Sequence, residues 1–289
     1  MNKMLKTLIY GGQMSLAVLD TTDMVNEAIK IHALSPTAAA ALGRALTACT
    51  FMCGALKSPQ DKLSVTIAGG GPGGKITVCG NGELFIRGSI DEPSADLPLK
   101  ANGKLDVGGL VGREGRLTVV RSMGLKEPWS GSSPLVSGEI AEDFAAYYAF
   151  SEQQPTAIAL GVKIGKDGTC LAAGGAVVQA MPGAEEQNLS EAENKVKSMG
   201  NISSLIEKEG AEGVMKRFFG AEEYNEYHPQ YKCLCSREYV AGLLVSLGKA
   251  ELEDIVEKEG SVKVGCQFCR KTYEFTAKDV GELFEKYGE

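Results

Sequence analysis

The chain has 289 residues, of which 44% are hydrophobic and 23% are charged, and its formal net charge is −7. This composition supports a sizeable hydrophobic core and excludes wholesale disorder. The acidic balance disfavours a general attraction to nucleic acid or to an anionic membrane. No stretch approaches 18 consecutive apolar residues, and the first residues lack a continuous apolar run, so we expect neither a transmembrane helix nor a secretory signal.

Residues 1–181 alternate strand-like and helix-like segments, which predicts a large N-terminal α+β domain. A helical stretch is expected over Thr37 to Lys57, opened by Ser35 as the cap and by Pro36, which suits the first helical position. A second helix is expected over residues 139–152. Its aromatic residues could bind other proteins, but their helical spacing favours a core face. The aromatic residues are Phe144, Tyr147 and Tyr148. Strands are expected at residues 62–68, 75–79, 117–120 and 156–164.

The glycine-rich segment at residues 69–74 fits the pattern G-x-G-x-x-G. A dinucleotide site of this type requires a helix directly after the glycines. Here the next residues, 75–79, alternate like a strand. The segment therefore predicts the turn of a β-hairpin.

Composition changes at Pro182, and residues 182–230 are interpreted as a short helical linker. Residues 184–228 carry ten acidic and five basic side chains. Short helices are expected at residues 185–199, 202–209 and 211–219, with few apolar positions. Helices this short are marginal without tertiary contacts, so we expect the linker to depend on its neighbours and to melt first.

The last segment, residues 231–289, contains four cysteines in two pairs that are separated by 30 residues. Two such pairs can converge on one tetrahedral ion, and soft thiolate donors suit zinc. The segment is too short to bury much core, so a metal would help to hold it together. The pattern therefore predicts a small zinc-binding domain with one zinc per chain. Its predicted ligands are Cys233, Cys235, Cys266 and Cys269.

Secondary structure is also expected around the cysteine pairs. Helices are predicted at residues 237–247 and 249–259, a strand at residues 272–275, and a final helix from about Ala277.

Four basic residues flank the thiols. They either offset the charge of a four-thiolate centre and favour thiolate, or they are ordinary surface charges. They are Lys232, Arg237, Arg270 and Lys271.

The C-x-C spacing has a redox consequence. Extended residues two apart place their Cα atoms near the upper limit for a disulfide. A bridge between Cys233 and Cys235 would require local rearrangement and would be readily reduced.

The other cysteines and the histidines lack a comparable pattern. Cys49 and Cys53 lie four apart on a predicted helix, which would suit a metal or a redox pair, but their apolar neighbours favour buried inert thiols. No role is assigned to Cys79 or Cys170. The two histidines have no evident catalytic partner: His32 lies on a predicted helix, and His228 is interpreted as a linker residue.

At its four C-terminal cysteines the chain resembles the heat-shock protein 33 family, also called 33 kDa chaperonins, which are redox-regulated holdase chaperones. The C-x-C, the interval of 30 residues and the C-x-x-C match the zinc signature of that family. The resemblance covers essentially the whole chain. The matching segments outside the signature are residues 21–48, the glycine-rich hairpin, and residues 103–112, 135–162 and 171–184.

The resemblance implies a cytoplasmic protein that is not an enzyme and is inactive as a chaperone when reduced and zinc-bound. Under oxidative stress, disulfides would pair Cys233 with Cys235 and Cys266 with Cys269. Zinc would leave, the linker would unfold, and the chain would dimerise and hold unfolding client proteins without ATP. Neither nucleic acid nor a membrane is expected as a partner.

Two other functions fit the four cysteines less well. A zinc-ribbon protein that binds nucleic acid or the ribosome should be basic, whereas residues 231–289 carry nine basic and eleven acidic side chains. A thiol oxidoreductase would turn over dithiol substrates, which an insulin-reduction assay detects.

Overall fold

The computed structural model describes residues 1–124 and 127–287, which divide into two compact units. The first unit comprises residues 1–232, and the second begins at Cys233. The fold class is α+β, as predicted. Within the described residues, no helix is both long and apolar enough to span a membrane.

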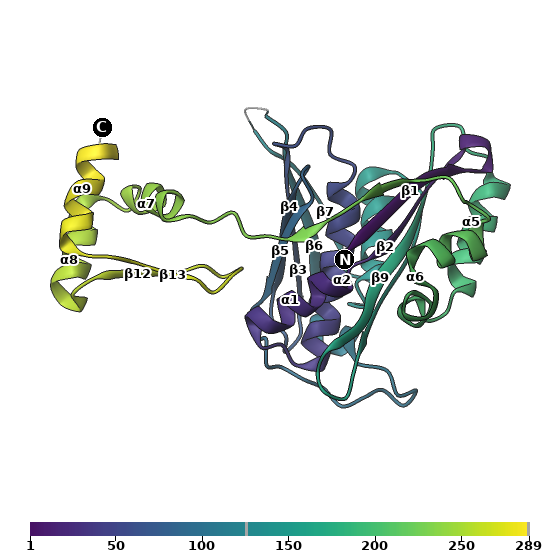
Figure 1. The fold of residues 1–289 in the computed structure, drawn as a ribbon, viewed down its shortest axis with the longest axis horizontal. Coiled ribbons are helices and arrows are strands. Elements are labelled where there is room, and N and C mark those ends of the chain that lie inside the picture. Colours follow the sequence, from purple (N-terminus) through teal and green to yellow (C-terminus); the bar gives the residue numbers. More distant parts are fainter. Residues whose placement is uncertain (125–126, 288–289) are drawn as a thin grey trace. The chain divides into compact units, whose positions relative to one another are not determined.

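The first unit contains two β-sheets (Figure 1). One sheet has the strand order β10-β1-β2-β9-β8 and is antiparallel throughout. Successive side chains along a strand point to opposite faces, and here both faces are buried. The strands are β1 (Lys3–Ile9), β2 (Met14–Asp20), β8 (Thr156–Ile164), β9 (Cys170–Ala180) and β10 (Asn225–Tyr227).

The second sheet has the order β11-β5-β4-β3-β6-β7, and β11 is parallel to β5 while the other pairs are antiparallel. The glycine-rich segment begins at the end of β3 and turns the chain into β4, which pairs antiparallel with β3, so the predicted hairpin is confirmed. The strands are β3 (Lys62–Gly70), β4 (Ile76–Asn81), β5 (Phe85–Ile90), β6 (Gly112–Ser122), β7 (Trp129–Pro134) and β11 (Gln230–Tyr231).

Helix α2 (Pro36–Cys53) lies between the two sheets and is buried along almost its whole length (Figure 1). Its start was predicted correctly, since the Ser35 hydroxyl accepts a hydrogen bond from the Ala38 amide at 3.1 Å. The small side chains of its alanine-rich sequence allow close packing on both sides. The neighbouring helices are α1 (Thr22–His32), α3 (Val107–Val111) and α4 (Ala141–Tyr147), which continues into a π-helical turn (Tyr148–Glu152).

The predicted linker helices cover the outer face of the first sheet (Figure 1). They are α5 (Glu186–Ser198) and α6 (Ile202–Phe219), and α6 is interrupted at Gly210. Gly210 has φ 68° and ψ 178°, which a residue with a side chain rarely adopts, so the predicted break is confirmed.

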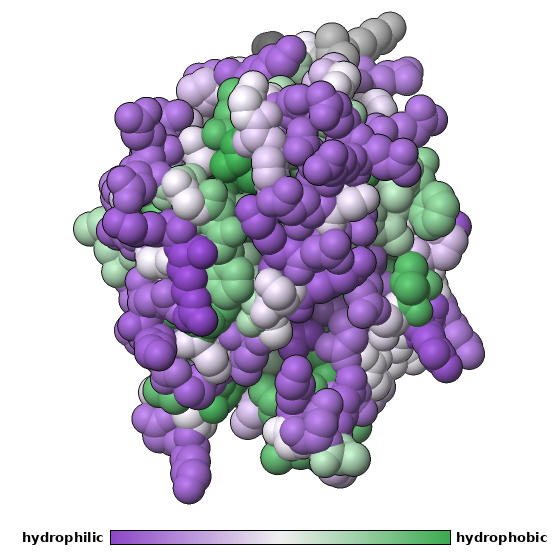
Figure 2. All heavy atoms as spheres, turned by 90° about the vertical axis from the view of Figure 1, so that its right-hand side faces the viewer, coloured by the Kyte–Doolittle hydropathy of each residue, from purple (hydrophilic) through white to green (hydrophobic). Residues whose placement is uncertain are grey.

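A second core, separate from the one around α2, lies beneath these helices. Alternate residues of the sheet contribute to it. The face of the molecule that carries α5 and α6 is mainly hydrophilic toward the solvent (Figure 2). The linker thus covers an apolar sheet face. The sheet residues buried there are Leu5, Met14, Leu16, Val18, Ala172, Ala176 and Val178, and those of the helices include Ala192, Val196, Ile202, Ile206, Val214 and Met215.

The second unit has a small core of its own, formed by helices around one short β-hairpin. Its buried residues include Leu244, Leu252 and Phe275. The predicted elements of this segment are confirmed. They are α7 (Arg237–Val245), α8 (Lys249–Glu259), β13 (Thr272–Phe275) and α9 (Ala277–Tyr287). The strand β12 (Val262–Gly265), which was not predicted, pairs with β13.

Candidate metal centre

Two loops of the second unit place the four cysteines. Cys233 and Cys235 precede α7, which begins after Ser236, whose hydroxyl accepts a hydrogen bond from the Tyr239 amide. Cys266 and Cys269 lie in the turn between β12 and β13. In this turn the amide of residue 270 donates to the Cys266 carbonyl and the Cys266 amide donates to the carbonyl of residue 271, both at 2.9 Å.

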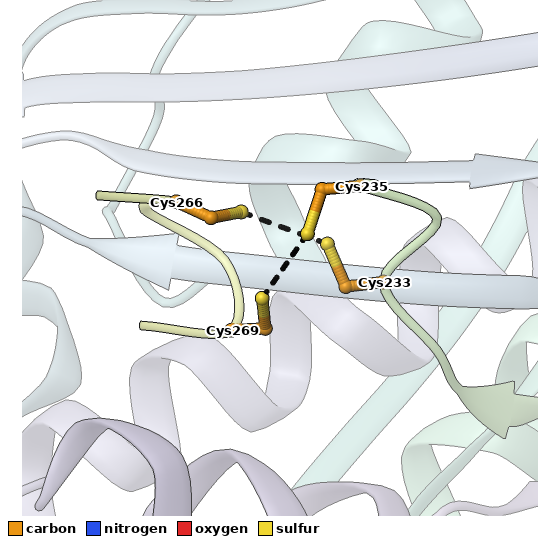
Figure 3. A group of neighbouring side chains, drawn as sticks. All are labelled: Cys233, Cys235, Cys266 and Cys269. Carbon is orange, nitrogen blue, oxygen red and sulfur yellow. Dashed lines mark hydrogen bonds between the residues drawn. The ribbon is translucent and has the colours of Figure 1, made fainter. Parts of the chain in front are cut away.

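The four sulfur atoms point toward one another (Figure 3). All four Sγ atoms lie within 4.8 Å of one another. Cys233 Sγ lies 3.6 Å from Cys266 Sγ, and Cys235 Sγ lies 3.3 Å from Cys269 Sγ. Four thiolates at about 2.3 Å from a zinc ion would be separated by roughly 3.8 Å. The donor set and its spacing therefore fit a tetrahedral metal, and the cluster can bind one metal ion.

Tyr273 of β13 contacts this cluster. Its hydroxyl lies 3.2 Å from Cys235 Sγ and 3.2 Å from the Cys235 carbonyl oxygen. Burial opposes ionisation of Cys235, but hydrogen bonds from Tyr273 and the other thiols outweigh it and lower the pKa of Cys235 to about 7. In contrast, burial raises the pKa of Cys233 and of Cys269. Cys235 is thus the thiol that this environment most favours as thiolate.

Two of the basic residues that flank the cysteines are held by other groups. Arg237 donates to the Glu274 carbonyl at 2.6 Å and to Asp279 at 2.8 Å, and it stacks over the Phe275 ring. Lys232, the last residue of the first unit, lies over the Phe85 ring at 3.7 Å. Arg237 therefore joins α7 to β13 and α9, and this is a structural role.

The remaining cysteines lie in the first unit and do not form part of the cluster. Cys49, Cys53 and Cys170 are buried, and Cys79 is partly buried. Burial raises the pKa of Cys49, and it raises that of Cys170 to about 12. This agrees with the interpretation of Cys49 and Cys53 as buried inert thiols.

The two histidines also lie outside the cluster. The side chain of His228 is 51% exposed, and its Nε2 lies 3.8 Å from Glu226 Oε1. His32 is buried at the end of α1, where its Nε2 lies 3.2 Å from the Tyr231 hydroxyl. Sequence reasoning missed this contact and the one at Tyr273, because each joins residues whose proximity only the folded chain creates.

Comparisons with known proteins agree with this arrangement. The family model described as "Hsp33 protein" matches residues 2–276. The chain belongs to the Hsp33 family. It is 40% identical over 288 residues to the 33 kDa chaperonin of Clostridium novyi (strain NT), covering 98% of each chain. It is 41% identical over 284 residues to that of Geobacillus sp. (strain WCH70), covering 97% of this chain and 96% of the relative.

A solved Hsp33 structure has the same fold. The crystal structure of the 33 kDa chaperonin (heat shock protein 33 homolog) from Thermotoga maritima superposes with a TM-score of 0.90 at 35% identity, and 98% of each chain is covered. Membership of the Hsp33 family supports a chaperone function, and such a function implies that the chain binds unfolded client proteins.

Proposed function

We propose that this Hsp33 chain is a redox-regulated, ATP-independent holdase whose activity is controlled by the four-cysteine centre. One observation carries the proposal: the linker, which lies directly before that centre in sequence, covers an apolar face of the first sheet. A change at the thiols that frees the linker would expose a surface suited to unfolded polypeptides.

In the reduced chain, the four thiolates would hold one zinc ion. The ion would supply folding energy to the second unit, whose own core is small. Tyr273 would donate a hydrogen bond to the Cys235 thiolate and hold it in position. This zinc-bound state is the inactive one.

Oxidation would remove the donors. Two thiols and one hydrogen peroxide give one disulfide and two waters, so two peroxides convert all four cysteines. We propose the pairs Cys233–Cys235 and Cys266–Cys269 by resemblance to the family. In the reduced fold Cys235 Sγ also lies 3.3 Å from Cys269 Sγ, so the competing cross-pairing is a defined outcome for peptide mapping by mass spectrometry.

Without zinc the second unit would unfold, and the linker would lose its attachment at that end. Helices α5 and α6 carry many charged side chains and are stabilised mainly by packing on the sheet. Their release would uncover Leu16, Val18 and Val178. The exposed face would bind unfolding clients and would also support a homodimer of the oxidised chain.

We place the protein in the cytoplasm, where reducing conditions keep the thiols metal-bound until oxidative stress. No chemical turnover is proposed, and neither nucleic acid nor a membrane is a proposed partner.

The proposal is tested by titrating the reduced, zinc-loaded chain with peroxide. Zinc release is followed with a chromogenic chelator, and light scattering of a heat-aggregating client is recorded on the same samples. We expect about one zinc per chain to leave as aggregation is suppressed, with reversal by dithiothreitol and zinc. Zinc release without suppression would limit the cluster to a structural role, and reduction of insulin by the chain would indicate an oxidoreductase.

Matched serine variants separate the centre from the other thiols. Cys235→Ser removes one metal ligand, so we expect most of the zinc to be lost. Chaperone activity should then appear even without peroxide. Cys79→Ser changes a partly buried thiol of the first unit and should keep both zinc and the peroxide requirement. Equal behaviour of the two variants would contradict the proposal.

A further inference from the structure

The segment of residues 225–232, which we call the strap, joins both sheets of the first unit. Its first part, β10, pairs with β1, where Tyr227 lies opposite Met4. Its second part, β11, is parallel to β5 and pairs with it at only two positions. Between them, the Asn2 side chain donates to the Pro229 carbonyl at 3.2 Å. The chain continues from the strap directly into Cys233.

Backbone pairing alone holds β11 weakly. The Gln230 amide donates to the Leu84 carbonyl at 3.0 Å, and the Lys232 amide donates to the Ile86 carbonyl at 2.8 Å. A two-residue strand at a sheet edge is marginal in isolation, so its persistence depends on side-chain contacts.

The Tyr231 side chain supplies those contacts. Its hydroxyl donates to the Gly88 carbonyl at 2.8 Å, accepts from the Gly88 amide at 3.4 Å, and lies 3.2 Å from His32 Nε2. Gly88 lies two residues beyond the last pair of β11, so the hydroxyl serves backbone groups that the short strand does not reach. Because the hydroxyl proton is committed to Gly88, His32 Nε2 acts as a donor.

This group, which we call the Tyr231 lock, joins the strap to α1 and β5 at once. The Tyr231 ring packs partly buried against the core around α2, and His32 is almost fully buried. The lock also stands two residues before the first predicted zinc ligand. Between the lock and the metal centre lies only Lys232, whose ammonium group lies over the Phe85 ring.

We propose that the Tyr231 lock sets how readily the linker is released once the thiols are oxidised, with Tyr231 and His32 as positioning residues. This inference rests on the proposed holdase function. While the metal centre is intact, the ordered Cys233 restrains the strap from its far end. When the second unit unfolds, that restraint disappears. The strap is then retained by the lock, the Asn2 contact, five strand pairs, and the side-chain contacts of Glu226 and Lys232.

The strap, which includes the last residues of the linker, in turn retains the linker helix α6. Lys3 of β1 forms ion pairs with Glu226 of the strap at 3.4 Å and with Glu212 of α6 at 2.5 Å. Loss of the strap would remove Glu226 from this group and, because the strap follows α6 in the chain, would free the C-terminal end of that helix. Weakening the lock should lower the oxidant dose that activates the chain, without changing the thiols.

The test compares Tyr231→Phe with wild type and with the matched control Tyr227→Phe, in which the altered side chain is 40% exposed. Tyr231→Phe keeps the ring and removes the hydroxyl. In the reduced, zinc-loaded chain we expect unchanged zinc content and about tenfold faster hydrogen exchange of the strap amides, because the hydrogen bonds of the hydroxyl are lost. The peroxide dose for half-maximal chaperone activity should fall, while Tyr227→Phe should match wild type.

A double-mutant cycle with His32→Leu assigns the effect to the pair. If the two residues form one lock, the double variant should exchange scarcely faster than Tyr231→Phe alone, because that substitution already removes the contact with His32. Exchange rates and peroxide dose for Tyr231→Phe equal to those of wild type would overturn the inference. Additive effects of the two substitutions would also overturn it.

One measurement needs no variant, should Tyr231→Phe fail to fold. In the wild-type chain stripped of zinc, the amides of Gln230 and Lys232 should remain more protected than those of α5. Immediate exchange of both amides on zinc removal would overturn the lock. If oxidised wild type shows no chaperone activity, the holdase proposal fails, but these exchange rates still decide whether the lock exists.

Discussion

At the residue scale, the pairing of the four cysteines predicted that they form one cluster, and their sulfur atoms do lie together. Their role as metal ligands stays a prediction. Tyr273 could not be identified from sequence, since its contact with Cys235 depends on how β13 lies beside the loop before α7. The same holds for His32 and Tyr231, which are 199 positions apart. Spacing finds ligands that are close in sequence, whereas groups that tune or anchor them are brought together only by tertiary structure.

The Tyr273 contact yields a prediction for metal affinity. Tyr273→Phe removes the hydrogen bond to Cys235 and keeps the ring, and loss of such a partner to a ligand typically weakens metal binding by about tenfold or more. Competition with a chromogenic chelator measures this. Tyr239→Phe, which changes an exposed side chain of α7, is the control. Equal zinc affinity of the two variants would argue against a tuning role for Tyr273.

Glu139 provides a pH-dependent prediction in the first unit. Burial opposes its ionisation, but hydrogen bonds from Lys100 and Arg44 outweigh it and lower the pKa of Glu139. The stability that this group contributes is complete above its unfolded-state pKa of about 4.3 and is lost as the pH falls through the lower folded-state value. We expect Glu139→Gln to cost about 1–3 kcal/mol at pH 7.

This cost should shrink as the pH falls below about 4, where the carboxylate of the wild-type chain becomes protonated. Urea unfolding followed by the fluorescence of Trp129, the single tryptophan, reports on the first unit alone. The exposed Glu142→Gln is the control. A cost that does not change with pH would show that the ion pairs of Glu139 do not stabilise the fold.

At the element scale, sequence patterns predicted long or well-capped elements better than edge elements. Helix α2 and the interrupted α6 could be identified from a proline after serine and from Gly210. The N-terminal hairpin β1–β2 was not predicted. The sheet that contains it is buried on both faces, so its strands lack the simple alternation of apolar and polar residues. Strands as short as β11 carry no pattern and form only because a neighbour is present.

The covered sheet face leads to a prediction about the linker. Ile206→Ala creates a cavity beneath α6 and should cost about 2–5 kcal/mol of local stability. We expect faster proteolysis within residues 185–220 of the reduced chain and a lower peroxide dose for activation. Ile67→Ala, an equal truncation in the core around α2, is the control. If both variants lower the dose equally, general instability and not linker release would explain the effect.

At the scale of the whole molecule, the chain consists of a large unit that carries the linker and a small unit that carries the metal centre. The sequence predicted the α+β class and the small cysteine-bearing segment. It did not predict that the linker helices would complete a second core on the sheet, because sparse apolar positions do not reveal which surface they cover. The division of roles among residues 1–181, 182–230 and 231–289 remains a prediction.

Metal removal tests the dependence of the small unit on zinc. A strong chelator under reducing conditions should unfold the second unit, because its small core depends on the metal for stability. We expect a loss of far-UV helical signal, with the fluorescence of Trp129 unchanged. Full retention of the helical signal would mean that this core suffices without metal.

The central claim is that oxidation of the cysteine centre releases the linker from the sheet, and hydrogen exchange measured by mass spectrometry tests it most directly. Reduced zinc-loaded and peroxide-treated samples would be compared while client aggregation is recorded in parallel. We predict that α5, α6 and the second unit lose protection, that the strands β3 to β6 keep it, and that chaperone activity rises with the loss at α6. Activity with α5 and α6 still fully protected would contradict the account.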